Sequence, residues 1–255
     1  MKRVTINNVH LWQFDHLSAE PRVHHFITDR NTHGKEFTLS LSSLPDKQKI
    51  HSNREMLASA FSIPPSQLYF PSQVHETRIV NITGKPSREE LANTDALVTA
   101  DKEVCIAVMS ADCVPILLYD KTNHAVAAIH SGWRGTVARI LEKTLHQMNT
   151  LFGTKGEDLI AGIGPSIGRE AYEVGEEVIG KIHQAFGDDK ELMVHHRAGK
   201  AKLDLWKANK IQLMEFGVSE SQIEISSLCT VTNNEHFFSA RKGDTGRFAA
   251  GIMLR

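Results

Sequence analysis

The stretch AVAAIHSGWRG, residues 125–135, leads from a run of small and branched apolar residues through a histidine into a glycine-containing loop. The apolar run up to Ile129 is typical of a buried strand. Gly132 and Gly135 flank a tryptophan and an arginine, two bulky side chains that do not suit the interior of a sheet. We therefore expect His130 to lie where the strand ends, a position at which α/β proteins commonly place chemistry.

The composition is that of an ordinary globular protein. The chain has 255 residues, of which 41% are hydrophobic and 23% charged, so it can bury a sizeable core and is not intrinsically disordered. The 29 basic and 30 acidic residues nearly cancel and form no long basic run. Because no global field attracts nucleic acid or an anionic membrane, we expect a small-molecule substrate. The oligomeric state stays open.

The cysteines and the hydropathy pattern favour a cytoplasmic protein. Cys105, Cys113 and Cys229 are odd in number and form no C-x-x-C pair, so we do not expect a disulfide scaffold. The N-terminal segment lacks the apolar stretch of a signal peptide, and no later run approaches the roughly 20 apolar residues of a membrane helix.

Apolar periodicity predicts one domain over residues 1–255, of the α+β class, with a largely mixed or antiparallel sheet and helices packed outside it. No repeat, low-complexity tract or flexible linker divides the chain. We expect strands at residues 23–28, 78–82, 96–100, 104–109, 114–119, 125–130, 159–164, 223–229 and 248–254, and helices at residues 46–61, 137–148, 176–186 and 203–217.

Three residues place a metal-binding or nucleophilic group where an apolar segment ends or is interrupted: His75, Cys113 and His130. Two imidazoles and one thiolate, with a fourth position open, form a ligand set of catalytic zinc, which lowers the pKa of bound water to about 7. Taken singly, each histidine also suits a hydrogen-bonded structural role, and Cys113 suits a buried apolar position. We assign Cys105 and Cys229 to the core because their neighbours are apolar.

A set of separated motifs resembles a known family. They are QVHE (73–76), SADCVP (110–115), HSGWRGT (130–136), GIGPSI (162–167), YEV (172–174), the cysteine-threonine pair at 229–230 and FSARKGDTGR (238–247). From roughly residue 20 to the C-terminus the chain closely resembles the YfiH family, also called the peptidoglycan editing factor or multicopper polyphenol oxidase (laccase) family. Several motifs in one order are far more specific than any single motif.

The resemblance implies a single domain with central mixed β-sheets and flanking helices, in α/β/β/α-like layers. It implies a zinc or copper ion at the catalytic residues that match His75, Cys113 and His130. The implied activity is phosphorolysis of adenosine, inosine and methylthioadenosine to base plus (deoxy)ribose 1-phosphate, with adenosine deamination alongside. Arg54 and Arg241 match residues of the family's motifs and are expected to line the substrate pocket. Our full set of expected substrate-binding residues is Arg54, Gln73, Arg134 and Arg241, of which the three arginines are the candidates for holding phosphate.

The chain departs from the family pattern at four places. Ser131 replaces an alanine, and Ala171 replaces a cysteine that therefore has no catalytic role here. The segment DRNTHGKE (29–36) replaces an arginine-glycine-glycine segment, and Ala240 replaces a tyrosine in the closing motif. The last two departures affect the expected substrate contacts more than the expected metal ligands.

The chemistry of the residues fits both reactions. Deamination needs an activated water, which a metal with an open position provides. Phosphorolysis needs a bound phosphate, and a guanidinium grips two oxygens of such an anion at once. Residues considered for the general acid are Glu76, Asp112 and His236.

Three other classes of function stay open. Cys113 with a histidine base would suit a cysteine-type amidohydrolase that edits peptidoglycan precursors. A copper-dependent polyphenol oxidase with a trinuclear cluster uses histidine-x-histidine pairs, and none of the fourteen histidines here stands two residues from another. A zinc-stabilised interaction protein would need a fourth protein ligand, which no motif offers.

Overall fold

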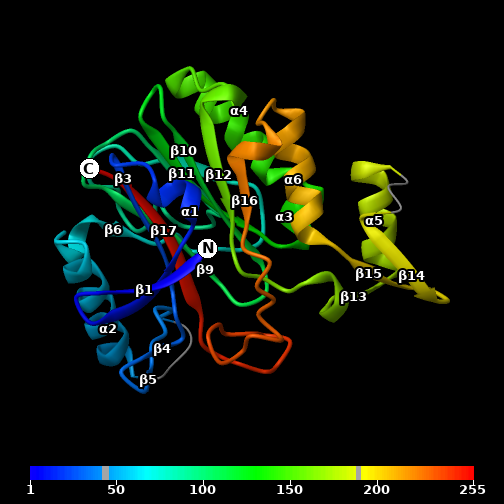
Figure 1. The fold of residues 1–255 in the computed structure, drawn as a ribbon, viewed down its shortest axis with the longest axis horizontal. Coiled ribbons are helices and arrows are strands. Elements are labelled where there is room, and N and C mark those ends of the chain that lie inside the picture. The colour runs from blue at the N-terminus through cyan, green and yellow to red at the C-terminus, as the bar shows by residue number, and fades with distance from the viewer. Residues whose placement is uncertain (42–45, 188–190) are drawn as a thin grey trace.

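Two six-stranded β-sheets face each other in the computed structural model, which describes residues 1–41, 46–187 and 191–255 (Figure 1). The first sheet has the order β1 (Lys2–Ile6), β2 (Val9–Gln13), β3 (Val23–Thr28), β17 (Phe248–Leu254), β9 (Cys105–Ser110) and β6 (Leu68–Tyr69). The second has the order β16 (Ile223–Ile225), β12 (Leu159–Ile163), β10 (Val114–Asp120), β11 (Ala125–Ser131), β8 (Ala96–Thr99) and β7 (Ile79–Asn81).

Alternating side chains on the central strands produce the layers. On β10, Leu117 and Tyr119 pack into the core between the sheets, whereas Ile116 and Leu118 pack into the core under the helices. The helices α4 (Ile140–Phe152) and α6 (Leu205–Glu215) cover the second sheet, and α2 (Lys47–Ala60) covers the outer face of the first. The α/β/β/α arrangement is therefore confirmed.

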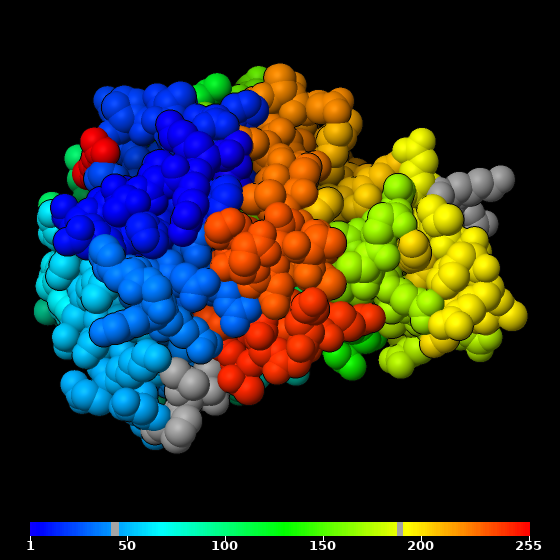
Figure 2. Space-filling view, turned by 60° about the horizontal axis from the view of Figure 1, so that its bottom comes forward, coloured from blue at the N-terminus to red at the C-terminus, as the bar shows by residue number. Residues whose placement is uncertain are grey.

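A smaller unit projects from one side of the layers, drawn yellow-green and yellow in Figure 2. It consists of a three-stranded sheet of β13 (Glu173–Gly175), β15 (Lys200–Leu203) and β14 (Met193–Arg197), with α5 (Glu176–Phe186) beside it. The remaining elements are α1 (Asp15–Ser18), α3 (Trp133–Val137), the strand pair β4 (Asn31–Thr32) and β5 (Lys35–Glu36), and the 3-10 turns Pro65–Gln67, Gly156–Asp158, Arg169–Ala171 and Glu220–Gln222.

The expected elements at residues 23–28, 176–186 and 248–254 match the structure end to end. The prediction of one continuous helix at residues 137–148 is wrong, because the structure has two helices there, α3 and α4. The chain breaks at Arg139, whose φ of 57° is left-handed. Apolar spacing did not reveal the break because the periodic positions before and after it keep the same three-and-four pattern.

The strand expected at residues 223–229 is too long. Strand pairing ends at Ile225, and Ser227 has a left-handed φ of 54°. Beyond it the segment keeps single backbone contacts with residues 163–166, including an isolated bridge between Cys229 and Ser166. The segment therefore leaves the sheet before it reaches the candidate site.

The N-terminal hairpin of β1 and β2 was not expected. β1 is an edge strand with mostly exposed side chains, so it has no apolar run to reveal it. The signal was the pair Asn7 and Asn8, whose φ angles of 44° and 69° match the left-handed residues of a two-residue hairpin turn. Among the described residues, no helix has both the length and the apolar character needed to span a membrane.

Candidate metal centre

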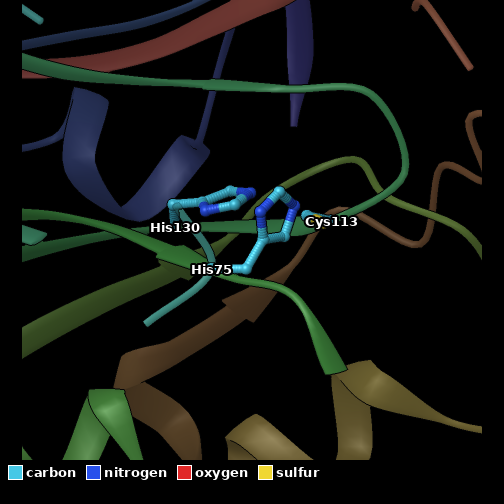
Figure 3. Close-up of side chains that lie close together, drawn as sticks. All are labelled: His75, Cys113 and His130. Atoms are coloured by element: carbon cyan, nitrogen blue, oxygen red, sulfur yellow. The ribbon is translucent and has the colours of Figure 1, made fainter. Parts of the chain in front are cut away.

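The side chains of His75, Cys113 and His130 converge at one end of the second sheet (Figure 3). One ligand atom from each residue lies within 4.8 Å of the other two. Tetrahedral zinc with bonds of about 2.0 to 2.3 Å needs ligand atoms about 3.3 to 3.8 Å apart. Small movements of the side chains would therefore bring the three atoms to coordination distance.

Strand pairing explains why these distant residues meet. β10 and β11 are antiparallel neighbours with Val114 opposite Ser131. The turn that carries Cys113 therefore lies beside the end of β11, which carries His130. His75 comes from the loop that precedes β7, a strand of the same sheet.

Asp95, at the entrance of β8, organises two of the three candidate ligands. Its side chain is fully buried, and Oδ1 accepts hydrogen bonds from the His75 amide at 3.0 Å and from Nδ1 of His130 at 2.8 Å. Oδ2 accepts from the amides of Val74 and Glu76 at 3.1 and 2.9 Å. Because Nδ1 of His130 donates to this carboxylate, Nε2 is the nitrogen left to bind a metal.

Sequence reasoning missed Asp95. The available signal was a lone carboxylate immediately before a fully buried strand, where an unpaired charge would be costly. That signal identifies no partner, so it did not connect Asp95 with the histidines.

Gly132 permits the chain to pass close to the candidate ligands. A Cβ atom at this position would lie 2.8 Å from Sγ of Cys113 and 3.3 Å from Cδ2 of His75. Any side chain here would therefore push the thiol away. The next polar neighbour, Ser131, is buried and contacts Thr136 and Asn209 at 3.0 and 2.9 Å, which ties the end of β11 to α3 and α6.

The protein itself favours a thiolate at Cys113 and an imidazolium at His130. Burial acts to raise the pKa of the Cys113 thiol, but the charges and hydrogen bonds of His130 and His75 outweigh it and lower this pKa to about 6. Burial acts to lower the pKa of His130, but Cys113 and Asp95 raise it to about 9. The thiolate is the form of cysteine that binds metals and attacks electrophiles.

The donor set fits a zinc or copper ion. One thiolate and two imidazoles are ligands that both metals accept. His130 is buried and His75 is exposed, so the centre opens to solvent on the side of His75. No other group of three such residues lies close enough to share an ion in the part of the chain that the structure describes.

Tyr172 lies within electrostatic range of Cys113 and of two arginines. The guanidinium of Arg241 lies over the Tyr172 ring, 5.4 Å from its centroid, and that of Arg134 lies over the Trp133 ring at 4.5 Å. Burial raises the pKa of Tyr172 to about 12; the charge of Cys113 adds to the rise, while Arg241 and Arg134 oppose it. Tyr172 was not among the expected site residues, although the YEV motif contains it.

Arg54 and Gln73 are engaged with backbone groups. Nε and Nη2 of Arg54 both donate to the carbonyl of Leu39, at 2.9 and 2.8 Å. Nε2 of Gln73 donates to the carbonyl of Met109 at 2.8 Å, and Oε1 of Gln73 accepts from the backbone N–H of Met109 at 2.7 Å. Both side chains thus hold loops in place.

The residues considered for the general acid are dispersed. His236 is bonded to the buried carboxylate of Asp29 at 3.0 Å, among the residues of the N-terminal strands. The side chain of Glu76 is exposed, beside the histidine of the QVHE motif. The carboxylate of Asp112 is bonded to Thr230 and to the backbone of Arg241.

Cys105 lies in the core as expected, but the same assignment is wrong for Cys229. Cys229 is half-buried, and its sulfur accepts a hydrogen bond from the amide of Gly168 at 3.2 Å. It leaves the core because strand pairing of its segment ends four residues earlier, at Ile225.

Comparisons with known proteins agree over most of the chain. The family model described as multi-copper polyphenol oxidoreductase laccase matches residues 24–255. A purine nucleoside phosphorylase of Bacteroides thetaiotaomicron is 38% identical over 256 residues, covering 94% of this chain and 95% of that protein. Adenosine deaminase RL5, from an unknown prokaryotic organism, is 34% identical over 220 residues, covering 82% of this chain and 84% of that protein. The crystal structure of the Bacillus licheniformis hypothetical protein YfiH is similar with a TM-score of 0.86 at 29% identity, over 91% of this chain and 93% of that one.

Proposed function

This chain belongs to the YfiH family, whose model is described as multi-copper polyphenol oxidoreductase laccase, and we propose that it is a metal-dependent purine nucleoside enzyme. Its reactions are phosphorolysis of adenosine, inosine and methylthioadenosine to base plus (deoxy)ribose 1-phosphate, and deamination of adenosine. The names of the two relatives support these two activities. The observation that carries the proposal is the convergence of His75, Cys113 and His130 on one solvent-accessible point.

The metal in this proposal is zinc, with copper as the alternative, held by His75, Cys113 and His130. When bound there, it supplies the activated water that deamination at C6 of the purine requires. The protein contributes the orientation of the donors: Asp95 holds His130 in the tautomer that presents Nε2, and it fixes the loop of His75 through backbone hydrogen bonds.

Phosphorolysis requires an anion site in addition to the metal ligands. A phosphate oxygen forms a bond to C1′ of the sugar while the bond from C1′ to the purine nitrogen breaks, and the departing base takes up a proton. We assign phosphate binding to Arg241 and Arg134, whose charges both act on Tyr172, as does that of Cys113. Arg54 and Gln73 serve the substrate pocket through the loops that they hold.

The test is product analysis with protein of known metal content. Adenosine is incubated with zinc-loaded, copper-loaded and metal-depleted protein, in the presence and absence of phosphate. The proposal predicts inosine alone without phosphate, and with phosphate also ribose 1-phosphate together with adenine and hypoxanthine, the base released from inosine. No product from the zinc-loaded and copper-loaded protein would overturn it.

A second candidate has one specific observation in its favour. His130 lies between Asp95 and Cys113: its ring is hydrogen-bonded to the carboxylate and also interacts with the thiolate. This is the arrangement of a cysteine hydrolase. Its substrate would be an amide such as a peptidoglycan precursor. Metal-free protein should then form a trappable acyl adduct at Cys113.

Polyphenol oxidation has less support. Trinuclear copper centres need many histidines, and the described residues contain a single three-residue group. As to location, we place the protein in the cytoplasm, because its three cysteines are all free.

A further inference from the structure

We propose that Asp112 is a positioning residue, a carboxylate that fixes the backbone of Arg241 so that its guanidinium can bind phosphate beside the metal centre. This inference rests on the proposed phosphorolysis. It adds a residue whose task is to connect the Cys113 turn with the closing segment, residues 226–247.

The hydrogen bonds of Asp112 join three separate segments. Oδ2 accepts from the Arg241 amide at 2.7 Å, and Oδ1 accepts from the Thr230 hydroxyl at 2.5 Å. The backbone carbonyl of Asp112 accepts from the amide of Ile167 at 2.9 Å. Asp112 precedes Cys113 directly, so these bonds tie the closing segment to the turn that carries a candidate ligand.

The backbone of Asp112 supports a dedicated role for its side chain. Its φ of 86° is in the left-handed region, where glycine is the residue of least strain. An aspartate at such a position is retained at a conformational cost that its carboxylate contacts can offset. Glycine would form this turn with less strain, so the backbone alone does not explain an aspartate here, whereas the contacts of its carboxylate do.

The closing segment is held at several points, and Asp112 holds the part around Arg241. The amide of Thr230 donates to the carbonyl of Ser166 at 3.0 Å at its start. It crosses the surface between the N-terminal strands and the projecting unit, as the orange and red atoms in Figure 2 show. Asp244 anchors its far part to Arg30 and to the amide of Ser239. Arg241 is exposed and its guanidinium lies over the Tyr172 ring, while its backbone amide is held by Asp112.

The experiment is a double-mutant cycle on the phosphate dependence of phosphorolysis, with metal content measured for every protein. The variants are Asp112→Gly, Arg241→Met, the double variant and Asp112→Asn. Losing one charge-assisted contact to phosphate corresponds to a roughly ten- to hundredfold higher KM for phosphate, and we expect this for Asp112→Gly and for Arg241→Met. The double variant should be no worse than Arg241→Met, because both changes remove the same contact.

Asp112→Asn is the matched rescue. Asparagine also tolerates the left-handed region, its oxygen can accept from the Arg241 amide, and its NH₂ can donate to the Thr230 hydroxyl. We expect its KM for phosphate to stay within about threefold of the original protein, well short of the full loss of a charge-assisted bond.

Three results would overturn the proposal. They are an unchanged KM for phosphate in Asp112→Gly, full additivity of the two changes in the double variant, and loss of metal from Asp112→Gly. The last would mean that the substitution acts by displacing Cys113. Amide hydrogen exchange provides a readout without activity. The Arg241 amide should exchange faster in Asp112→Gly and not in Asp112→Asn. If the original protein forms no sugar phosphate, the proposed phosphorolysis fails, while the exchange result still decides whether Asp112 holds Arg241.

Discussion

Replacing Asp95 by asparagine should weaken metal binding without removing any of the three candidate ligands. Each oxygen of the carboxylate accepts two N–H groups: Oδ1 those of His75 and the His130 ring, and Oδ2 those of Val74 and Glu76. Asparagine retains one oxygen, and its NH₂ must face the other pair of donors. Either orientation of the amide therefore leaves donors unsatisfied.

The magnitude follows from those donors. An unsatisfied buried N–H costs about 1 to 3 kcal/mol, and the amides of Val74, His75 and Glu76 are only partly buried, so the free energy of unfolding should fall by about 1 to 3 kcal/mol. If the NH₂ faces His130, Nδ1 must release its proton and Nε2 must carry one, which blocks the metal-binding nitrogen. Loss of such an orienting carboxylate typically weakens metal affinity about 10- to 100-fold.

Two measurements separate these effects: zinc affinity by competition with a chelator, and unfolding in urea. The matched control is Asp120→Asn. Asp120 is also fully buried, at the other end of β10, and accepts the amides of Thr122 and Asn123 at 2.9 and 2.8 Å. The control should lose stability and keep its zinc affinity. Wild-type zinc affinity in Asp95→Asn would refute the orienting role.

Four further changes test the centre and its surroundings. Cys113→Ser should release most of the metal and abolish both activities together, and a variant with full metal stoichiometry would exclude the thiolate as a ligand. Arg241→Met should damage phosphorolysis much more than deamination, because only phosphorolysis binds an inorganic anion; equal losses in metal-replete protein would contradict this assignment. Gly132→Ala should reduce bound zinc, measured by elemental analysis, because its Cβ would lie 2.8 Å from the sulfur, whereas Gly180→Ala, where the space is open, should retain it. Lowering the pH from 7 to 4.5 should cost about 2 to 3 kcal/mol of unfolding free energy through His25 alone. Burial lowers the pKa of this imidazole to about 4 in the folded protein, so below the unfolded value of 6.5 the unfolded chain binds a proton that the folded protein does not, and stability falls. His25→Gln should show a smaller loss in urea titrations at the two pH values, and an identical loss would rule out His25 as a source of acid sensitivity.

Local pattern was sufficient for most of the layers. The strands of the second sheet are nearly continuous apolar runs, and α5 and β17 have clear starts and stops, so their bounds could be read from spacing and turn residues. The polar edge strand β1 and the break at Arg139 could not be read in this way. Neither stands out in the apolar pattern, because β1 has only two half-buried apolar residues, Val4 and Ile6, and the break preserves the spacing.

The candidate ligands could be named from the sequence because each ends or interrupts an apolar segment with a chemically distinctive group. The residues that surround and orient these ligands could not be named in this way. Asp95 lies twenty residues from His75, and nothing in its local sequence says that one carboxylate will accept hydrogen bonds from the loop of His75 and from His130 on β11. The contact between Asp112 and Arg241 spans more than half of the chain in the same way.

The sequence by itself determined the elements and the residue types available for chemistry, because helix and strand periodicity, turn residues and donor atoms are properties of short segments. The tertiary structure decided which of those donors meet. It brought His75, Cys113 and His130 together and turned Arg54 and Gln73 toward backbone carbonyls. The reason is physical: such encounters depend on the antiparallel register of β10 and β11 and on the packing of loops against strand ends, and these are set by burial across the whole chain.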